Sequence, residues 1–129
     1  MTKTFATLKD LKVGKHVIID DEPCRIVEVQ TSAPGKHGAA KMRVAAIGIF
    51  TNSKKTLLKP ADAEVEVPII ERKTGQIVSV QGESAQIMDL QTYETFEITM
   101  PEELRAGAEA GKEVEYIETM GRRMITRIR

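Results

Sequence analysis

Residues 24–30, CRIVEVQ, decide the class of fold. Cys24 and Ile26 fall on one side of an alternating pattern and Val29 on the other, which predicts a β-strand. Residues 41–50, KMRVAAIGIF, predict a second long strand, so residues 31–40 form an expected hairpin loop. Shorter strands are predicted at 16–19, 56–58 and 64–67, with turns at 20–23 and 51–55. Short strands at this spacing predict a small β-barrel in the first half of the chain.

The second half repeats this rhythm. Strands are predicted at 76–81, 85–90, 93–99, 113–119 and 122–128, and Pro101 opens one short helix before the fourth of them. Three strands, a short helix and two further strands follow the order of an OB-fold barrel. The segment 68–75 is the expected boundary, and it divides an all-β chain into domains at 1–70 and 71–129.

Composition narrows the class of protein. The chain has 129 residues, with 19 basic and 19 acidic side chains, which argues against a uniformly basic nucleic-acid binder. A single cysteine, Cys24, excludes an internal disulfide framework and fits a reducing compartment. The first residues lack the apolar stretch and small-residue cleavage site of a signal peptide, and charged residues interrupt every apolar run, so we expect neither a signal peptide nor a membrane span. We therefore expect a soluble, cytoplasmic protein with no membrane partner.

The charge is unevenly distributed. Residues 1–70 carry 11 basic and 8 acidic side chains, and residues 71–129 carry the reverse. The window 29–61 has no Asp or Glu, and its cations are Lys36, Lys41, Arg43, Lys54, Lys55 and Lys59. Such a window indicates a surface that meets a polyanion, and RNA is the polyanion we expect. A solvated basic face without a partner remains the alternative.

Catalytic and metal chemistry find no support in the motifs. Two histidines and one cysteine, widely separated, do not have the spacing of a zinc site. No Gly-x-Ser-x-Gly elbow is present, and the paired acids at 20–21 and 102–103 are explained by a turn and a helix start. We expect no enzyme activity and no metal.

The hairpin loop is the most informative segment. Gly35 and Gly38 can adopt positive φ on either side of Lys36 and His37, and Pro34 stiffens the approach. This chemistry projects the amine of Lys36 outward, away from any acid. An ordinary solvated hairpin loop is an equal alternative on loop chemistry alone.

The loop resembles that of a known family. Residues 34–38, PGKHG, followed by AAK at 39–41, resemble the modification loop of the archaeal initiation factor 5A family. Residues 44–51, VAAIGIFT, and the lysine-rich turn 52–55 are also similar to that family. The resemblance covers the whole chain and implies an N-terminal SH3-like barrel followed by a C-terminal OB-fold. Ala33 and Ala39 depart from the commonest pattern and reduce polar contact around the tip.

The resemblance also implies a function. Lys36 would be the acceptor of an aminobutyl group from spermidine, transferred by deoxyhypusine synthase with NAD, giving deoxyhypusine or hypusine. The partners would be the ribosome and peptidyl-tRNA, and the factor would promote peptide-bond formation at proline runs and assist elongation and termination. It would bind no cofactor. Gly35 and Gly38 would shape the tip, flanked by Pro34 and His37, and the RNA-facing cations would be Lys41, Arg43, Lys54 and Lys55.

Two other readings remain open. A generic RNA-binding or RNA-chaperone module would use the basic barrel without modification of Lys36. It predicts that Lys36→Ala costs no more RNA affinity than Lys54→Ala. An enzyme with an undetected site would show turnover in the purified chain.

Overall fold

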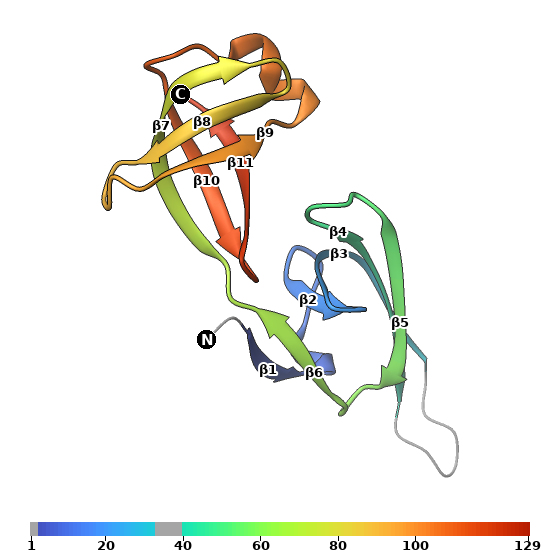
Figure 1. The fold of residues 1–129 in the computed structure, drawn as a ribbon. Coiled ribbons are helices and arrows are strands. Elements are labelled where there is room, and N and C mark those ends of the chain that lie inside the picture. The colour runs from blue at the N-terminus through green and yellow to red at the C-terminus, as the bar shows by residue number, and fades with distance from the viewer. Residues whose placement is uncertain (1–2, 33–39) are drawn as a thin grey trace. The chain divides into compact units, whose positions relative to one another are not determined.

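The computed structural model describes residues 3–32 and 40–129, and the chain divides between Ile69 and Ile70 into two compact units. Each unit is built from antiparallel strands around its own hydrophobic core. Figure 1 shows the strands curling within each unit, with helical turns confined to short connections. The expectation of an all-β chain is confirmed.

The first unit forms a small barrel. Its strands make a two-stranded sheet, β1-β6, and a four-stranded sheet in the order β2-β3-β4-β5. Its elements are β1 (Lys3–Thr7), the 3₁₀ turn η1 (Leu8–Asp10), β2 (His16–Ile19), β3 (Glu22–Ser32), β4 (Lys41–Gly48), β5 (Lys54–Pro60) and β6 (Glu64–Pro68). Sequence patterning missed β1 and η1, because Lys3–Thr7 lacks a clear apolar alternation and finds its place by pairing with β6.

The alternation predicted for β3 is wrong beyond Ile26, because the strand has a bulge at Val27. Ile26 pairs with Ala46 and Glu28 with Ala45, so Val27 is the extra residue. A bulge shifts the phase of every later side chain by one residue. Val29 therefore packs against the core on the same side as Ile26, whereas simple alternation predicted the opposite side.

The turn between β2 and β3 is tighter than predicted. Asp20 and Asp21 both have positive φ, 53° and 61°, and they alone connect the strands. Two consecutive residues of positive φ are the requirement of a type I′ hairpin turn, which aspartate tolerates. Glu22 and Pro23, predicted as part of the turn, already belong to β3.

The core of the first unit is aliphatic. Leu8, Val17, Ile26 and Val44 are fully buried, and each such side chain contributes about 1.5–3 kcal/mol relative to exposure. Leu8 is held in place by η1, whose Leu8 N–H donates to the carbonyl of Ala63 at 2.9 Å. This hydrogen bond ties η1, and with it the buried side chain of Leu8, to the loop between β5 and β6.

The second unit is a five-stranded sheet in the order β11-β10-β7-β8-β9. Its elements are β7 (Glu71–Gln81), β8 (Ser84–Asp89), β9 (Thr95–Thr99), the 3₁₀ helix η2 (Glu102–Gly107), β10 (Glu113–Thr119) and β11 (Arg122–Ile128). The predicted short helix is thus a 3₁₀ helix. Strand order and helix position are those of an OB-fold barrel, as expected.

The segment 68–75, expected as the boundary between the two domains, is largely strand, because β7 begins at Glu71. Gly75, the last residue of that boundary segment, lies buried inside β7. A Cβ atom there would lie 2.7 Å from Cγ2 of Ile87 and 3.1 Å from the carbonyl oxygen of Met88. Glycine is used here for close approach of a neighbouring strand rather than for a turn.

Candidate nucleic-acid interface

The hairpin of β3 and β4 carries the segment that the sequence singled out. Lys36 and its neighbours Pro34, Gly35, His37 and Gly38 lie at 33–39, outside the described residues. The structure describes both ends of that segment. Ser32 and Lys41 are paired across the hairpin, and the carbonyl of Ala40 accepts a hydrogen bond from the N–H of Ala61 at 2.7 Å. Both ends are therefore anchored by backbone pairing.

Three of the four predicted RNA-facing cations share one face of the sheet. Lys41 and Arg43 lie two residues apart on β4, so their side chains point to the same side. Lys54 is paired with Ile47, which continues the same alternating row of β4. Because cross-strand partners share a face, Lys41, Arg43 and Lys54 lie on the outer face of β3-β4-β5, opposite the core.

Lys55 is separated from the other three. It is paired with Ala46, which is fully buried in the core, so Lys55 starts on the core-facing side of β5. Its Nζ atom lies 3.6 Å from Oδ2 of Asp20 in the β2–β3 turn. Its charge is therefore directed toward an acid of its own unit rather than toward the outer face.

Two charged residues of the outer face were not singled out from the sequence. Arg25 is paired with Ile47, in the row of β4 that also holds Lys41 and Arg43. Glu28 joins that face only because the Val27 bulge shifts the phase, and its Oε1 accepts a hydrogen bond from Nε2 of Gln30 at 2.8 Å. Alternation from Cys24 could have found Arg25, whereas nothing local to Glu28 signals the bulge.

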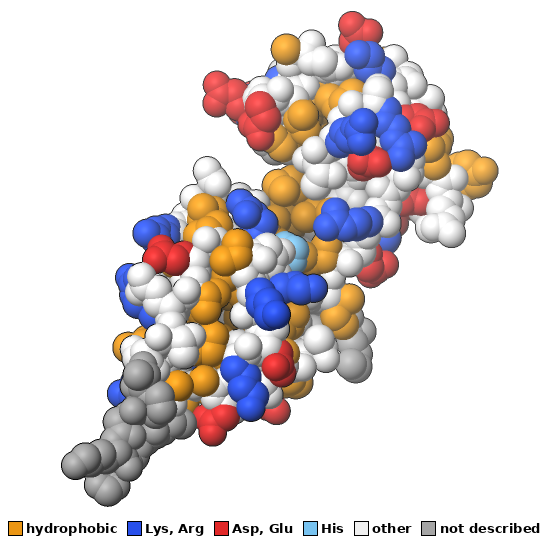
Figure 2. Space-filling model, turned by 180° about the vertical axis from the view of Figure 1, so that it is seen from behind, with side chains coloured by type: hydrophobic (Ala, Val, Ile, Leu, Met, Phe, Trp, Pro, Cys, Tyr) orange, Lys and Arg blue, Asp and Glu red, His pale blue; other side chains and the backbone are white. Residues whose placement is uncertain are grey.

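The outer face is basic but not uniformly so. The carboxylate of Glu28 lies on the same face as the cations Arg25, Lys41, Arg43 and Lys54. Leu58, which is 64% exposed, is paired with Arg43. On the side of the molecule seen in Figure 2, Lys and Arg side chains of the first unit lie among hydrophobic, uncharged and acidic ones. Scattered charges of this kind give a moderate field that salt screens readily.

Cys24 has the surroundings of a structural residue. Its side chain is fully buried, and Sγ donates a weak hydrogen bond to the carbonyl of Glu22 at 3.4 Å. Burial raises the pKa of the Cys24 thiol, and the charge of Glu22 adds to that effect. A buried thiol with a raised pKa is a poor nucleophile.

Neither a cluster of metal ligands nor a membrane-spanning helix is found among the described residues. In the part of the chain that the structure describes, no three His, Cys, Asp or Glu side chains gather as metal ligands would. Within the same residues, no helix has the length and apolar character needed to cross a bilayer.

Both units match known family models. Residues 2–63 match the model described as translation initiation factor 5A-like, N-terminal. Residues 69–129 match the model described as eukaryotic elongation factor 5A hypusine, DNA-binding OB fold. Together the two matches cover most of both units.

Curated relatives and solved structures agree with these models. The chain is 55% identical over 124 residues to translation initiation factor 5A of Methanopyrus kandleri, covering 95% of this chain and 91% of the relative. It is 53% identical over 126 residues to that of Archaeoglobus fulgidus, covering 98% of each. The fold matches the eukaryotic translation initiation factor 5A from Methanococcus jannaschii with a TM-score of 0.93 at 50% identity, covering 99% of this chain and 96% of the other.

Proposed function

Because this chain belongs to the translation initiation factor 5A family, we propose that it acts on the ribosome beside peptidyl-tRNA, with Lys36 as its modified contact. The family is one of translation factors, and the model that matches the second unit is a hypusine type. Membership supports a role in translation. What we propose beyond membership is the contact with the ribosome, peptidyl-tRNA as the molecule acted on and Lys36 as the modified residue.

The observation that carries this proposal is the anchored hairpin. Strand β3 has 11 residues and β4 has 8, and the Ser32–Lys41 pair holds both ends of the Lys36 segment together. Two long paired strands that hold both ends of a segment together form a stiff support, which suits a segment that must reach a distant target. Lys41 and Arg43 lie on the strand that leaves the segment, on the outer face with Lys54.

The cations of that face suit a nucleic-acid backbone. Lysine and arginine neutralise phosphates without reading sequence, and such contacts fix the orientation of a bound protein. Lys41, Arg43 and Lys54 would hold the first unit against RNA, and Lys36 would make a contact of its own. Lys55, directed toward Asp20, would contribute less.

Modification would change the reach and charge of Lys36. Deoxyhypusine synthase would transfer the aminobutyl group of spermidine onto the lysine amine and release 1,3-diaminopropane. Its NAD would accept a hydride from spermidine and return it to the product, so the transfer is redox-neutral. The side chain would then carry two amines, both protonated near neutral pH as alkyl amines are. Such a rod suits phosphate oxygens and 2′-hydroxyls at the acceptor end of a tRNA.

The gain in rate would come from positioning. The ribosome performs the chemistry, and a factor that orients a slow peptidyl-tRNA removes part of the entropic barrier. Proline runs are the substrates that would benefit most, and elongation and termination would be assisted in the same way. The chain would act in the cytoplasm as an accessory factor, without turnover or a bound cofactor of its own.

Peptide mass spectrometry of the fragment spanning Lys36, from protein isolated from its native cells, tests the modification. We expect the added mass of an aminobutyl group, with or without one hydroxyl oxygen. Unmodified lysine throughout the sample would overturn the proposal and favour a generic RNA-binding module.

A translation assay tests the role of the residue. Modified protein should speed synthesis of a reporter with a proline run, and Lys36→Arg should abolish that effect while a reporter without prolines is translated equally. If Lys36→Ala instead lowers RNA affinity no more than Lys54→Ala, and the proline reporter is unaffected, the module binds RNA without modification.

A further inference from the structure

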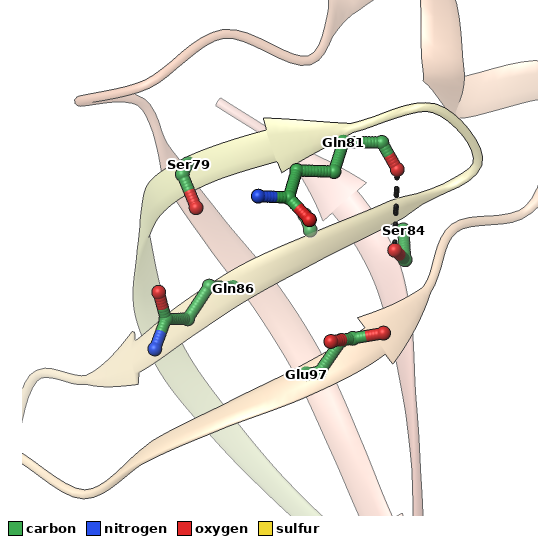
Figure 3. Close-up of a pocket in the computed structure, with 6 residues that line it drawn as sticks. Ser79, Gln81, Ser84, Gln86 and Glu97 are labelled. Atoms are coloured by element: carbon green, nitrogen blue, oxygen red, sulfur yellow. Dashed lines mark hydrogen bonds between the residues drawn. The ribbon is translucent and has the colours of Figure 1, made fainter.

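The outer face of β7, β8 and β9 contains a small polar hollow (Figure 3). Its volume is about 180 Å³, and it lies entirely within the second unit. Its lining residues are Ser79, Gln81, Ser84, Ala85, Gln86 and Glu97. None of these residues has a role in the proposed function.

Strand register brings these side chains together. Gln86, on β8, is paired with Ser79 of β7 on one side and with Glu97 of β9 on the other. The register shift between Ile77 and Ser79 turns Ser79 to the outer face, although Ile77 is buried in the core. Three neighbouring strands therefore present a hydroxyl, a carboxamide and a carboxylate in one row.

Most of the polar groups in the hollow are uncommitted. The Ser84 hydroxyl donates to the carbonyl of Gln81 at 3.2 Å. Within the described residues, the side chains of Ser79, Gln81, Gln86 and Glu97 make no hydrogen bond or ion pair. Figure 3 shows these side chains standing on three adjacent strands around the same space. The hollow therefore offers one carboxylate and several neutral acceptors to a ligand.

The lining chemistry argues against nucleic acid. A phosphate backbone requires cations, and single-stranded bases require aromatic platforms. The six lining residues include neither. The second unit also carries 11 acidic and 8 basic side chains, so its overall field repels a polyanion.

The size of the hollow argues against a free small molecule. Sites for such ligands usually enclose about 300–1,000 Å³ and are mostly apolar. A space of about 180 Å³ lined by polar groups suits the head group of one side chain. The matching head group is a cation with several donors.

We propose that this hollow, the Glu97 site, binds an arginine side chain of a partner protein. A guanidinium presents five N–H donors in a planar fork, of which two can pair with the Glu97 carboxylate. The remaining donors face the carboxamide oxygen of Gln86 and the hydroxyl of Ser79 across the strands. The acidic character of the second unit would draw a basic protein segment toward the site.

The proposal is tested by titrating the full-length ¹⁵N-labelled chain with the capped peptide acetyl-Gly-Arg-Gly-amide. We expect saturable amide shift changes at Ser79, Gln81, Gln86 and Glu97. The same peptide with citrulline, a neutral isostere of arginine, should cause none. The lysine peptide should bind more weakly, because an ammonium cannot form the two-fold pair.

Glu97→Gln separates a site from general attraction to an acidic surface. This variant keeps the shape of the side chain and should weaken binding about threefold or more, as expected for loss of a partly exposed ion pair. Glu109→Gln removes one exposed carboxylate of the same unit outside the hollow and should leave the Kd unchanged. Equal losses in the two variants, or shift changes spread over the whole unit, would overturn the proposal. Shift changes at the same residues with an oligouridylate in place of the peptide would assign the site to nucleic acid and also overturn it. None of these outcomes depends on the modification of Lys36.

Discussion

The guanidinium carbon of Arg123 lies 4.1 Å from the centroid of the Phe96 ring. Arg123 belongs to β11 and Phe96 to β9, the two strands at opposite ends of the five-stranded sheet. These strands close the barrel without a ladder of backbone hydrogen bonds between them. Arg123 also contacts Glu118 through Nε at 2.6 Å and Glu94 through one terminal nitrogen at 3.2 Å. A single side chain therefore bridges the open seam of the second unit.

Arg123→Ala should loosen this seam. The variant loses a cation–π contact and two ion pairs, which together correspond to about 1–2 kcal/mol of unfolding free energy. Tyrosine fluorescence in a denaturant titration checks the loss, because both tyrosines, Tyr93 and Tyr116, belong to the second unit and the chain has no tryptophan. Arg127→Ala, an exposed change on the same strand, should cost far less. Equal losses would contradict the seam role.

Asp89 should make the second unit sensitive to acid. Burial alone raises the pKa of Asp89, but hydrogen bonds from the Tyr116 hydroxyl and the N–H groups of Thr92 and Gln91 outweigh it and lower that pKa from 3.8 to about 2. The ionised carboxylate therefore stabilises the fold above pH 3.8 by about 2 kcal/mol, and this contribution is lost as pH falls to about 2. Burial, followed by the same hydrogen bond, raises the pKa of Tyr116.

Denaturant titrations of Asp89→Asn at several pH values measure how the contribution of the Asp89 carboxylate to stability depends on pH. The variant should be less stable than the parent chain at pH 7, and the difference should shrink between pH 4 and pH 2. Asp62→Asn, an exposed change in the first unit, should leave the tyrosine transition unaltered at every pH. A difference that stays constant down to pH 2 would show that the Asp89 charge does not carry the effect.

Gly75→Ala should destabilise the second unit. The added methyl would lie 2.7 Å from Cγ2 of Ile87 and 3.1 Å from the backbone oxygen of Met88, and both neighbours are held in the sheet. Overpacking of this kind costs about 1–3 kcal/mol. Gly107→Ala is the matched control, because nothing lies within 4 Å of its Cβ position. Thermal unfolding followed by tyrosine fluorescence should separate the two, and unchanged Tm in Gly75→Ala would refute the close approach.

Met120→Asn should stabilise the hairpin of β10 and β11. Met120 and Gly121 form the two-residue turn with φ of 51° and 76°, and the left-handed region costs a non-glycine residue about 1–2 kcal/mol. Asparagine tolerates that region, so we expect a gain of about 0.5–1 kcal/mol in unfolding free energy. Met120→Val, with a β-branched side chain, should lose stability in the same denaturant titration. A gain with valine would show that side-chain contacts, not φ, dominate.

Lys54→Ala should weaken binding to ribosomes more than Lys55→Ala. Lys54 shares the outer face with Lys41 and Arg43, whereas Lys55 is directed toward Asp20. Loss of one phosphate contact should lower affinity roughly threefold or more and reduce the slope of log K against log salt by about 1. Affinity measured across a salt series distinguishes the variants, and equal losses would mean that sheet face does not decide which lysine contacts RNA.

Much of the fold could be predicted from local patterns. Alternation at 24–30 predicted β3, and the predicted strands 113–119 and 122–128 match β10 and β11. The turn at 120–121 was also predictable, because Gly121 tolerates positive φ. Strand β1 could not be predicted, since its stability comes from pairing with β6, more than fifty residues away.

The candidate interface was predictable in content but not in arrangement. The acid-free window 29–61 included Lys41, Arg43, Lys54 and Lys55 among its six cations. Composition does not state on which side of a strand each residue falls. Lys54 and Lys55 are adjacent in sequence and therefore point to opposite faces, and only the pairing of β5 with β4 shows which one joins Arg43.

The sequence by itself determined the β class, the two-barrel order and the loop motif that points to the family, because these depend on side-chain period, turn residues and short-range spacing. The tertiary structure decided the phase of β3 after the Val27 bulge, the separation of Lys55 from the basic face and the bridge between Arg123 and Phe96. The physical reason is that the first two depend on the register of a partner strand, and the third on closure of the sheet between two strands that share no ladder. Register is set by packing of the whole sheet, and a shift of one residue moves every later side chain to the opposite face.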